Sequence, residues 1–211
     1  MRAMRRRRRL KSVHILAVIL VVAGIGALTV SLTKPPPLTP QPIQTGVKVI
    51  RVVEGRFRET DQPVMAEGGK LVVYFFTATD CVYCAKERIP FVEAMGEFGE
   101  WRGLKRIKTK DIPTYSLEES SFASERIEVR LYELDKQALN PGVKEFFERY
   151  SPEHRIPTLI IGGKYFRIGA YPGVGDDFKR NTYEITPSQE REIDNIVSLV
   201  VELLEEVSQR S

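Results

Sequence analysis

The sequence is poor in the residues that form disulfides and ligate metals, with two cysteines and two histidines among 211 residues. Two cysteines can form at most one disulfide within the chain. A structural zinc site normally needs four cysteine or histidine ligands. Beyond the first 32 residues, His154 is the one further candidate of that type. The composition therefore disfavours a structural zinc site and a framework of several disulfides.

Beyond the amino terminus, the sequence lacks a large cluster of basic residues. Seven of the 32 basic residues lie in the first 11 positions, which leaves 25 basic against 28 acidic residues in the rest. The later part of the chain therefore has a slight negative charge, and no nucleic-acid partner is expected. Internal repeats are also lacking. Gly173 and Gly175 do not make a phosphate-binding fingerprint, because no strand–helix context surrounds them.

An uncharged apolar run at residues 13–32 follows a basic tail at residues 1–12. As a helix, this run would span about 30 Å, which matches the hydrocarbon thickness of a bilayer. The basic tail is expected to stay in the cytoplasm, so that the later residues are exported. A cleaved signal peptide is the alternative, but its apolar core is usually only about 7–15 residues long. We therefore expect an uncleaved single-pass anchor in the cell membrane.

Residues 33–46 are rich in proline and predict a semi-rigid spacer of polyproline II type. Residues 47–211 are long enough for one domain with a core of its own. Apolar runs and alternation predict strands at 47–53, 71–76, 127–134, 158–161 and 165–168. Apolar residues at helical spacing predict helices at about 84–98, from Asn140 onward and after Thr186.

The predicted order is β, β, α, β, α, β, β, α. Gly162-Gly163-Lys164 joins the last two strands as a hairpin turn. One crossover unit followed by a hairpin and a covering helix indicates an α/β domain. We expect a mixed sheet with helices on both faces.

The two cysteines form a C-x-x-C motif, Cys81-Val82-Tyr83-Cys84, between the predicted strand 71–76 and a helix. At a helix N-terminus, unpaired N–H groups and the helix dipole favour a thiolate. The motif therefore indicates reversible thiol–disulfide exchange by a redox-active disulfide. A static structural disulfide is the alternative, since exported proteins often contain one. A bridge that closes so short a loop, however, constrains little unfolded-state entropy.

This motif, together with Ile156-Pro157-Thr158 before the predicted hairpin, resembles the thioredoxin family. The resemblance extends from about residue 71 to residue 169, with the terminal helix in its expected place. It implies a thioredoxin-like sheet, a cis peptide bond before Pro157 and a position of that proline beside the cysteine pair. Because proline lacks an N–H, the backbone before it would be free to pair with a substrate strand.

The sequence departs from the family pattern near the motif. Val82-Tyr83 is neither the Gly-Pro of thioredoxins nor the Pro-His of periplasmic oxidases, and the tyrosine is similar to that of glutaredoxins. Asp80 stands where thioredoxins have tryptophan. Phe75 stands where they have a buried acid that is thought to help deprotonate the second thiol. Exchange would then rely on Asp80, on water, or on no proton acceptor at all.

Each candidate site residue has an expected role. Cys81 should be the nucleophile because it lies nearer the helix N-terminus and is the more exposed, and Cys84 should resolve the mixed disulfide. Tyr83, Asp80 and the segment Ile156–Thr158 should shape the substrate site. Asp80 could relay a proton or raise the pKa of the thiol by repulsion, or it could serve as a helix N-cap.

Three further residues with basic side chains allow two interpretations each. Lys86 and Arg155 could lower the pKa of Cys81 electrostatically, and His154 could approach the thiols from the loop before Pro157. For all three, a solvated surface position without a functional role is the favoured interpretation. Segments 99–126 and 170–186 exceed the minimal fold, and we expect solvated surface insertions there.

These observations predict a membrane-anchored, extracytoplasmic thiol–disulfide oxidoreductase that acts on protein thiols and disulfides. It requires no bound cofactor, but a redox partner must recycle the pair. The sequence leaves the direction of exchange open between oxidation, reduction and isomerisation. Two other classes of function also stay open: a non-catalytic thioredoxin-like scaffold, and a metal-delivery protein that binds a copper(I)-like ion through two thiolates.

Overall fold

The computed structural model describes residues 46–174, 177 and 182–210. The predicted basic tail at 1–12, the anchor at 13–32 and nearly all of the linker at 33–46 lie outside the described residues. Among the residues that are described, no helix is both long and apolar enough to cross a bilayer.

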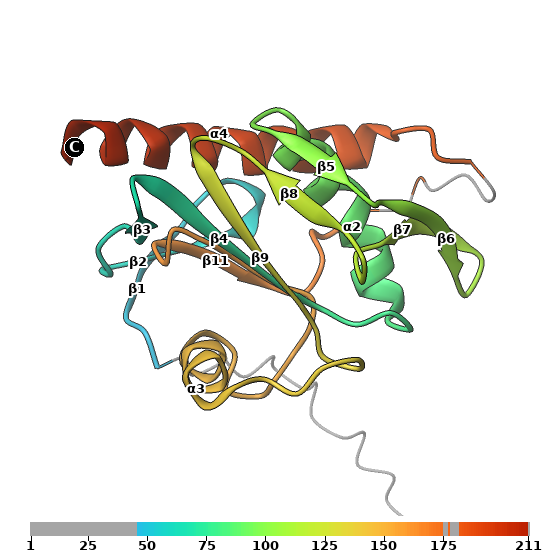
Figure 1. Ribbon diagram of the computed structural model, residues 1–211, viewed down its shortest axis with the longest axis horizontal. Coiled ribbons are helices and arrows are strands. Elements are labelled where there is room, and N and C mark those ends of the chain that lie inside the picture. Colours follow the sequence, from blue (N-terminus) through green and yellow to red (C-terminus); the bar gives the residue numbers. More distant parts are fainter. Residues whose placement is uncertain (1–45, 175–176, 178–181, 211) are drawn as a thin grey trace, which may run out of the picture. The chain divides into compact units, whose positions relative to one another are not determined.

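A mixed sheet forms the centre of the described domain (Figure 1). Its strands lie in the order β1 (Val49–Val52), β2 (Arg58–Thr60), β11 (Tyr165–Ile168), β10 (Thr158–Ile161), β4 (Lys70–Thr77) and β3 (Ala66–Glu67), and β9 (Ile127–Glu133) also pairs with β4. The β4–β9 pair is parallel, whereas the other pairs are antiparallel. This arrangement confirms the predicted mixed sheet.

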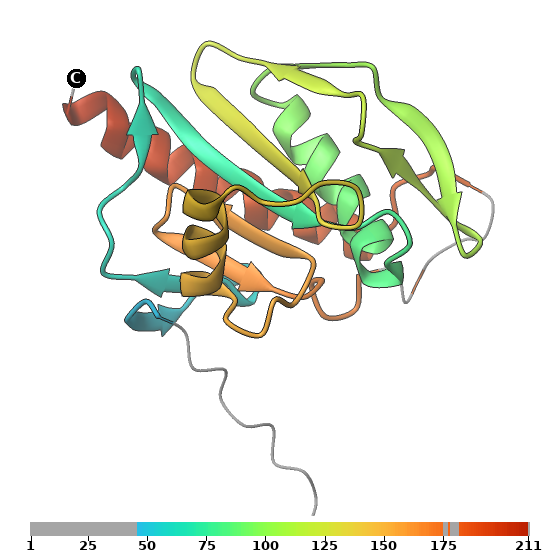
Figure 2. The ribbon, with the colours of Figure 1, turned by 60° about the horizontal axis from the view of Figure 1, so that its bottom comes forward.

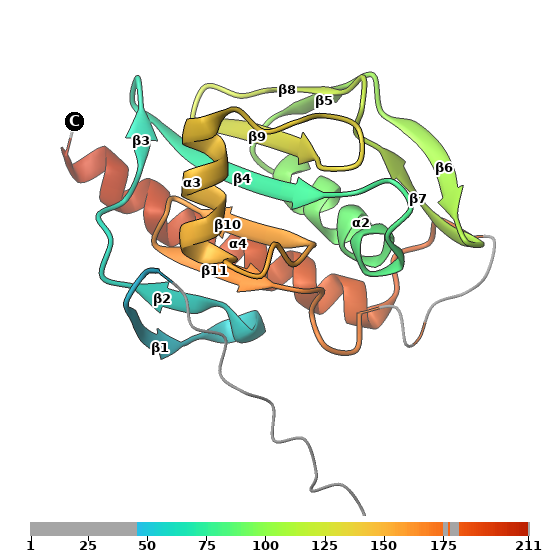
Figure 3. The same ribbon diagram turned by 90° about the horizontal axis from the view of Figure 1, so that it is seen from below.

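Helices cover both faces of the sheet, as predicted. Helix α3 (Pro141–Tyr150) lies on one face, and α2 (Val82–Gly96) and α4 (Pro187–Arg210) lie on the opposite face (Figures 1 and 3). The capping signals are also confirmed. Asn140 Oδ1 accepts from the Val143 N–H at 2.9 Å, and the Thr186 N–H donates to Gln189 Oε1 at 3.0 Å.

Strand β4 is a central strand of the sheet and is deeply buried. From Leu71 to Thr77 all of its side chains are buried, on both faces. Phe75 stacks on Phe91 of α2 at 4.4 Å between ring centroids, and Phe76 stacks on Phe147 of α3 at 4.3 Å. A strand that is buried on both faces reads as a continuous apolar run rather than as an alternating one.

The amino-terminal part of the sheet differs from the single strand predicted at 47–53. The chain forms a hairpin of β1 and β2 around a short 3₁₀ helix, Glu54–Arg56. In the described part of the chain, β1 is an outer strand, and all four of its side chains are exposed. The pairing of β1 with β2 shifts register between Val49 and Arg51. Sequence alternation could not reveal β2, because it has only three residues.

The segment 99–126 was expected to be a solvated surface insertion, and the structure shows that part of it is exposed and part is buried against α2. It forms four strands, β5 (Glu100–Arg102), β6 (Lys105–Thr109), β7 (Ile112–Ser116) and β8 (Ser121–Ala123), which pair as β5–β8 and β6–β7. These pairs lie beside α2 in two views (Figures 1 and 2). The Trp101 Nε1–H donates to the Val92 carbonyl of α2 at 2.9 Å. Packing on α2 thus places these residues against the core.

Trp101 is the one tryptophan of the sequence, so its fluorescence reports on the contact between this segment and α2. Its ring lies 5.0 Å from that of Phe122. We expect Phe122→Ala to lower the free energy of unfolding by about 1–3 kcal/mol and to shift the tryptophan emission to longer wavelength. Chemical denaturation followed by fluorescence measures both effects.

Ser121→Ala is the matched control, because Ser121 is an exposed neighbour on the same strand. It should leave the emission and the stability nearly unchanged. Identical spectra for Phe122→Ala and the unaltered protein would contradict the contact between Trp101 and Phe122.

Candidate functional site

The cysteine pair lies where β4 ends and α2 begins. Cys81 and Cys84 form a disulfide with a Cα–Cα distance of 5.1 Å. Cys81 is the N-cap of α2, and its sulfur accepts from the Cys84 N–H at 3.1 Å. Cys81 is half-buried, whereas Cys84 is fully buried. The expectation that Cys81 is the more exposed sulfur, at the helix N-terminus, is therefore confirmed.

Hydrogen bonds to three other segments hold the short loop between β4 and α2. The Thr79 N–H donates to the Asp135 carboxylate at 2.9 Å, and Thr109 Oγ1 of β6 donates to the Thr79 carbonyl at 2.9 Å. Arg88 donates through Nη2 to the Ala78 carbonyl. Segments far apart in the sequence thus fix the backbone immediately before Cys81.

Arg88 is fully buried on the second turn of α2. Besides Ala78, its guanidinium donates to Thr77 Oγ1 at 3.3 Å and approaches the Tyr115 carbonyl at 3.5 Å. Glu133, at the end of β9, lies 3.9 Å from Arg88. Burial raises the pKa of the Glu133 carboxyl, while the Arg88 charge acts in the opposite direction.

The segment Ile156–Thr158 lies at the same end of the sheet as the cysteine pair. Thr158 is the register partner of Phe76, so β10 begins where β4 ends. The peptide bond between Ile156 and Pro157 is cis, which agrees with the sequence expectation. Thr158 Oγ1 donates to the Arg155 carbonyl at 2.7 Å. Within the described part of the chain, no backbone hydrogen bond engages Ile156.

The two other predicted site-shaping residues are both exposed. The Tyr83 side chain, between the cysteines, retains 64% of its accessible surface. Asp80 is exposed as well, but it is not the helix N-cap that its residue type suggested. Cys81 takes that position, because the helix begins one residue later than an Asp80 cap requires.

Lys86, His154 and Arg155, for which two interpretations were given, have different surroundings. His154 Nε2 lies 2.9 Å from Glu148 Oε1 of α3, and Arg155 pairs with Glu153 at 2.9 Å on the surface. Their nearest partners are thus carboxylates outside the cysteine motif. Lys86 is half-buried near the N-terminus of α2.

A second buried charge cluster joins α2 to the sheet and to α4. Arg167 of β11 pairs with Glu87, one turn after Cys84, and with Glu192 of α4 at 2.6 Å. All three side chains are at most 4% exposed. The Tyr171 N–H donates to Glu87 Oε2 at 3.1 Å. Burial raises the pKa of Glu87 to about 8, although Arg167 favours its charged form.

No role was predicted from the sequence for Glu87, Arg88, Glu133 or Arg167. The first two lie on a helix whose other buried residues are Cys84, Ala85, Ile89, Pro90, Phe91, Val92, Ala94 and Met95. Two charged residues within such an apolar helix are the signal that could have indicated buried charge. The partners carry no comparable signal, because Glu133 ends β9 and Arg167 lies in the short strand β11.

Within the described ranges, no cluster of three or more histidine, cysteine, aspartate or glutamate residues is arranged to hold a metal ion. No protein-family model matches the sequence, and neither a curated protein nor a solved structure matches the chain. The function is therefore argued from the chemistry of the site.

The raised pKa of Glu87 predicts a pH dependence of stability. The carboxyl has an ordinary value of 4.5 and a value of about 8 in the folded chain. The unfolded chain therefore loses this proton at lower pH than the folded chain. The stability that the protonated group contributes is complete below about pH 4.5 and is lost as the pH rises to about 8. In Glu87→Gln, unfolding free energies measured between pH 5 and pH 8 should fall less steeply than in the unaltered protein.

Glu97→Gln, at the exposed end of the same helix, serves as the control and should keep the original slope. Equal slopes for Glu87→Gln and the unaltered protein would show that Glu87 does not titrate in this range.

Proposed function

We propose that this chain is a membrane-anchored, extracytoplasmic thiol–disulfide oxidoreductase with a thioredoxin-like domain. The observation that carries the proposal is the C-x-x-C pair at the junction of β4 and α2. Its first cysteine is half-buried at the helix N-terminus and its second cysteine is buried. An accessible cysteine at a helix N-terminus beside a protected resolving cysteine is the arrangement that disulfide exchange requires.

The order of elements supports the resemblance to the thioredoxin family. From β4 onward the main elements are β4, α2, β9, α3, β10, β11 and α4, which matches the order that the resemblance implies. The β1–β2 hairpin and the strands of segment 99–126 are additions to that order. The segment Ile156–Thr158 begins β10 beside the end of β4, which agrees with a proline near the cysteine pair.

In the reducing direction, the Cys81 thiolate attacks one sulfur of a substrate disulfide, and the substrate S–S bond breaks as the mixed disulfide forms. The departing substrate thiolate takes a proton from water. Cys84, after losing its own proton, attacks the Cys81 sulfur and releases the second substrate sulfur as a thiolate. Two electrons thus pass from the dithiol to the substrate. The reverse sequence oxidises substrate thiols.

Two features suit the binding of an extended protein substrate. The backbone of Ile156 has no hydrogen bond in the described part of the chain, so it can pair with a substrate strand. The exposed ring of Tyr83 offers apolar area next to the nucleophile. The chemistry needs no bound cofactor, but a separate redox partner must return the pair to its starting state. The apolar run at 13–32 would hold the domain outside the cytoplasm.

The proposal predicts that the Cys81–Cys84 couple of the full chain equilibrates with glutathione. We expect a reversible two-electron transition between about −120 and −270 mV, the range of the disulfide oxidoreductases. Alkylation of free thiols at each glutathione ratio, followed by mass spectrometry, gives the midpoint. Its value also gives the direction in which the protein works.

Two variants separate the roles of the sulfurs. Cys84→Ser should accumulate mixed disulfides, because the resolving thiol is absent, whereas Cys81→Ser should form none. A pair that resists reduction below about −300 mV would instead identify a structural bridge and favour a scaffold domain. Stoichiometric copper(I) uptake that both variants abolish would favour metal delivery.

The membrane proposal predicts that the full chain stays with the membrane fraction after washing at alkaline pH, whereas a chain that lacks residues 1–45 becomes soluble. Immunoblotting of the fractions measures this. Release of the full chain by the wash would contradict an uncleaved anchor.

A further inference from the structure

Arg88 lies directly beneath the loop that carries the cysteine pair. Its Nη2 donates to the Ala78 carbonyl, and the Cys81 N–H donates to the same carbonyl at 3.4 Å. One shared acceptor therefore separates the guanidinium from the Cys81 backbone. We infer that Arg88 and Glu133 form a charge pair that sets the stability of the Cys81 thiolate, with Arg88 favouring the thiolate and Glu133 opposing it. This inference rests on the proposed exchange chemistry of the pair.

The helix geometry keeps Arg88 on the side of the cysteines. Arg88 is four residues after Cys84 and seven after Cys81, and residues at these spacings share one face of a helix. Its side chain has no solvent exposure, so bulk water and salt screen its charge much less than a surface charge. A fixed positive charge beneath the loop stabilises the thiolate relative to the neutral thiol.

Glu133 is the counter-charge of this arginine. Its side chain is 6% exposed and lies 3.9 Å from the guanidinium. Arg88 is the main group that favours its charged form, followed by the backbone of Leu117, and among the described residues no side chain hydrogen-bonds either carboxylate oxygen. The residue also lines a pocket of about 330 Å³ with Lys136 and Gln137, but both of its carboxylate oxygens are buried. An ionised Glu133 offsets part of the field of Arg88.

The other acidic groups around this pair are exposed. Asp80 in the loop, Glu118 after β7 and Asp135 after β9 act on Arg88 or Glu133 electrostatically, but each lies at the surface. Lys86, on the same helix, is half-buried. Water screens the surface carboxylates, so the buried pair dominates the field at the loop.

Arg88 and Glu133 carry opposite charges, so substitutions of the two residues should shift the pKa of the Cys81 thiol in opposite directions. In the full chain, Arg88→Met should raise the pKa of the Cys81 thiol by about 1 and shift the equilibrium with glutathione toward the disulfide by up to about tenfold, or about 30 mV. Glu133→Gln should lower the pKa of the thiol and shift the same equilibrium toward the dithiol. The thiol pKa is read from the alkylation rate of Cys81 against pH, after reduction with a phosphine.

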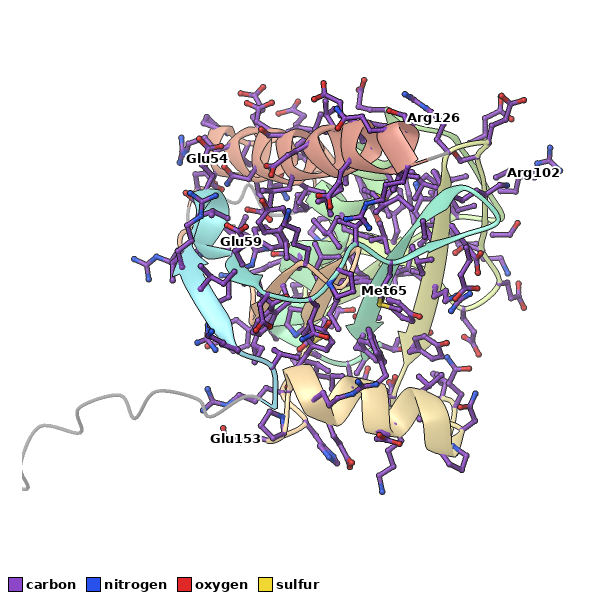
Figure 4. All side chains as sticks on the ribbon, turned by 90° about the vertical axis from the view of Figure 1, so that its left-hand side faces the viewer. Glu54, Glu59, Met65, Arg102, Arg126 and Glu153 are labelled. Atoms are coloured by element: carbon purple, nitrogen blue, oxygen red, sulfur yellow. A yellow bond between two sulfur atoms is a disulfide. The ribbon has the colours of Figure 1, made fainter. Side chains whose placement is uncertain are left out.

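Two further variants test whether charge, rather than support of the fold, is responsible. Arg88→Lys keeps the charge and should retain most of the original pKa and equilibrium. Arg102→Met removes an equal charge from β5, where the side chain points away from the chain (Figure 4), and should change neither quantity. Thermal unfolding of every variant shows whether it is folded.

The inference is overturned if Arg88→Met leaves the alkylation profile unchanged. It is equally overturned if Glu133→Gln gives no shift, or a shift in the same direction as Arg88→Met, since loss of support would move both variants alike. These results differ from a failure of the proposed function. In that case the unaltered protein would not equilibrate with glutathione, while the alkylation profile of its reduced form could still be measured.

Discussion

The burial of β4 on both faces is the constraint on which the position of the cysteine pair depends. Aromatic stacking holds this strand to α2 on one side, through Phe75 and Phe91, and to α3 on the other, through Phe76 and Phe147. Pairing with β9 and β10 fixes its two edges. The strand therefore cannot slide or turn without exposing apolar side chains. Its end delivers Cys81 to a defined place at the start of α2.

Two buried arginines add a second, polar constraint on the same face of the sheet. Arg167 ties Glu87 of α2 to Glu192 of α4, and Arg88 reaches Glu133 of β9. Such pairs contribute little net stability compared with apolar packing, because the desolvation of two charges offsets their attraction. The hydrogen bonds of Arg167 to Glu87 and Glu192, however, are directional and favour one rotation of α2 against the sheet. The helix that carries both cysteines is thus oriented by ionic contacts that an apolar interface would not supply.

Patterns with a strong local cause could be predicted from the sequence. The run 71–76, the hairpin around Gly162-Gly163 and the caps at Asn140 and Thr186 all depend on neighbouring residues, and the structure has each of them. Contacts between distant segments could not be predicted from such local patterns. Trp101 and Thr109 contact α2 and the cysteine loop only because the chain folds back over that helix. The buried charge pairs were missed for the same reason, since Glu133 and Arg88 meet through the sheet and not through sequence spacing.

The outer strand β1 has a consequence for the protein at high concentration. Val49, Ile50 and Val52 are exposed on it, and in the described part of the chain it pairs with β2 alone. An open apolar edge is a template on which a second chain can add its own strand. The register shift between Val49 and Arg51, together with the charge of Arg51, interrupts that template. The register shift and the charge of Arg51 are therefore two features of this four-residue strand that oppose edge-to-edge association.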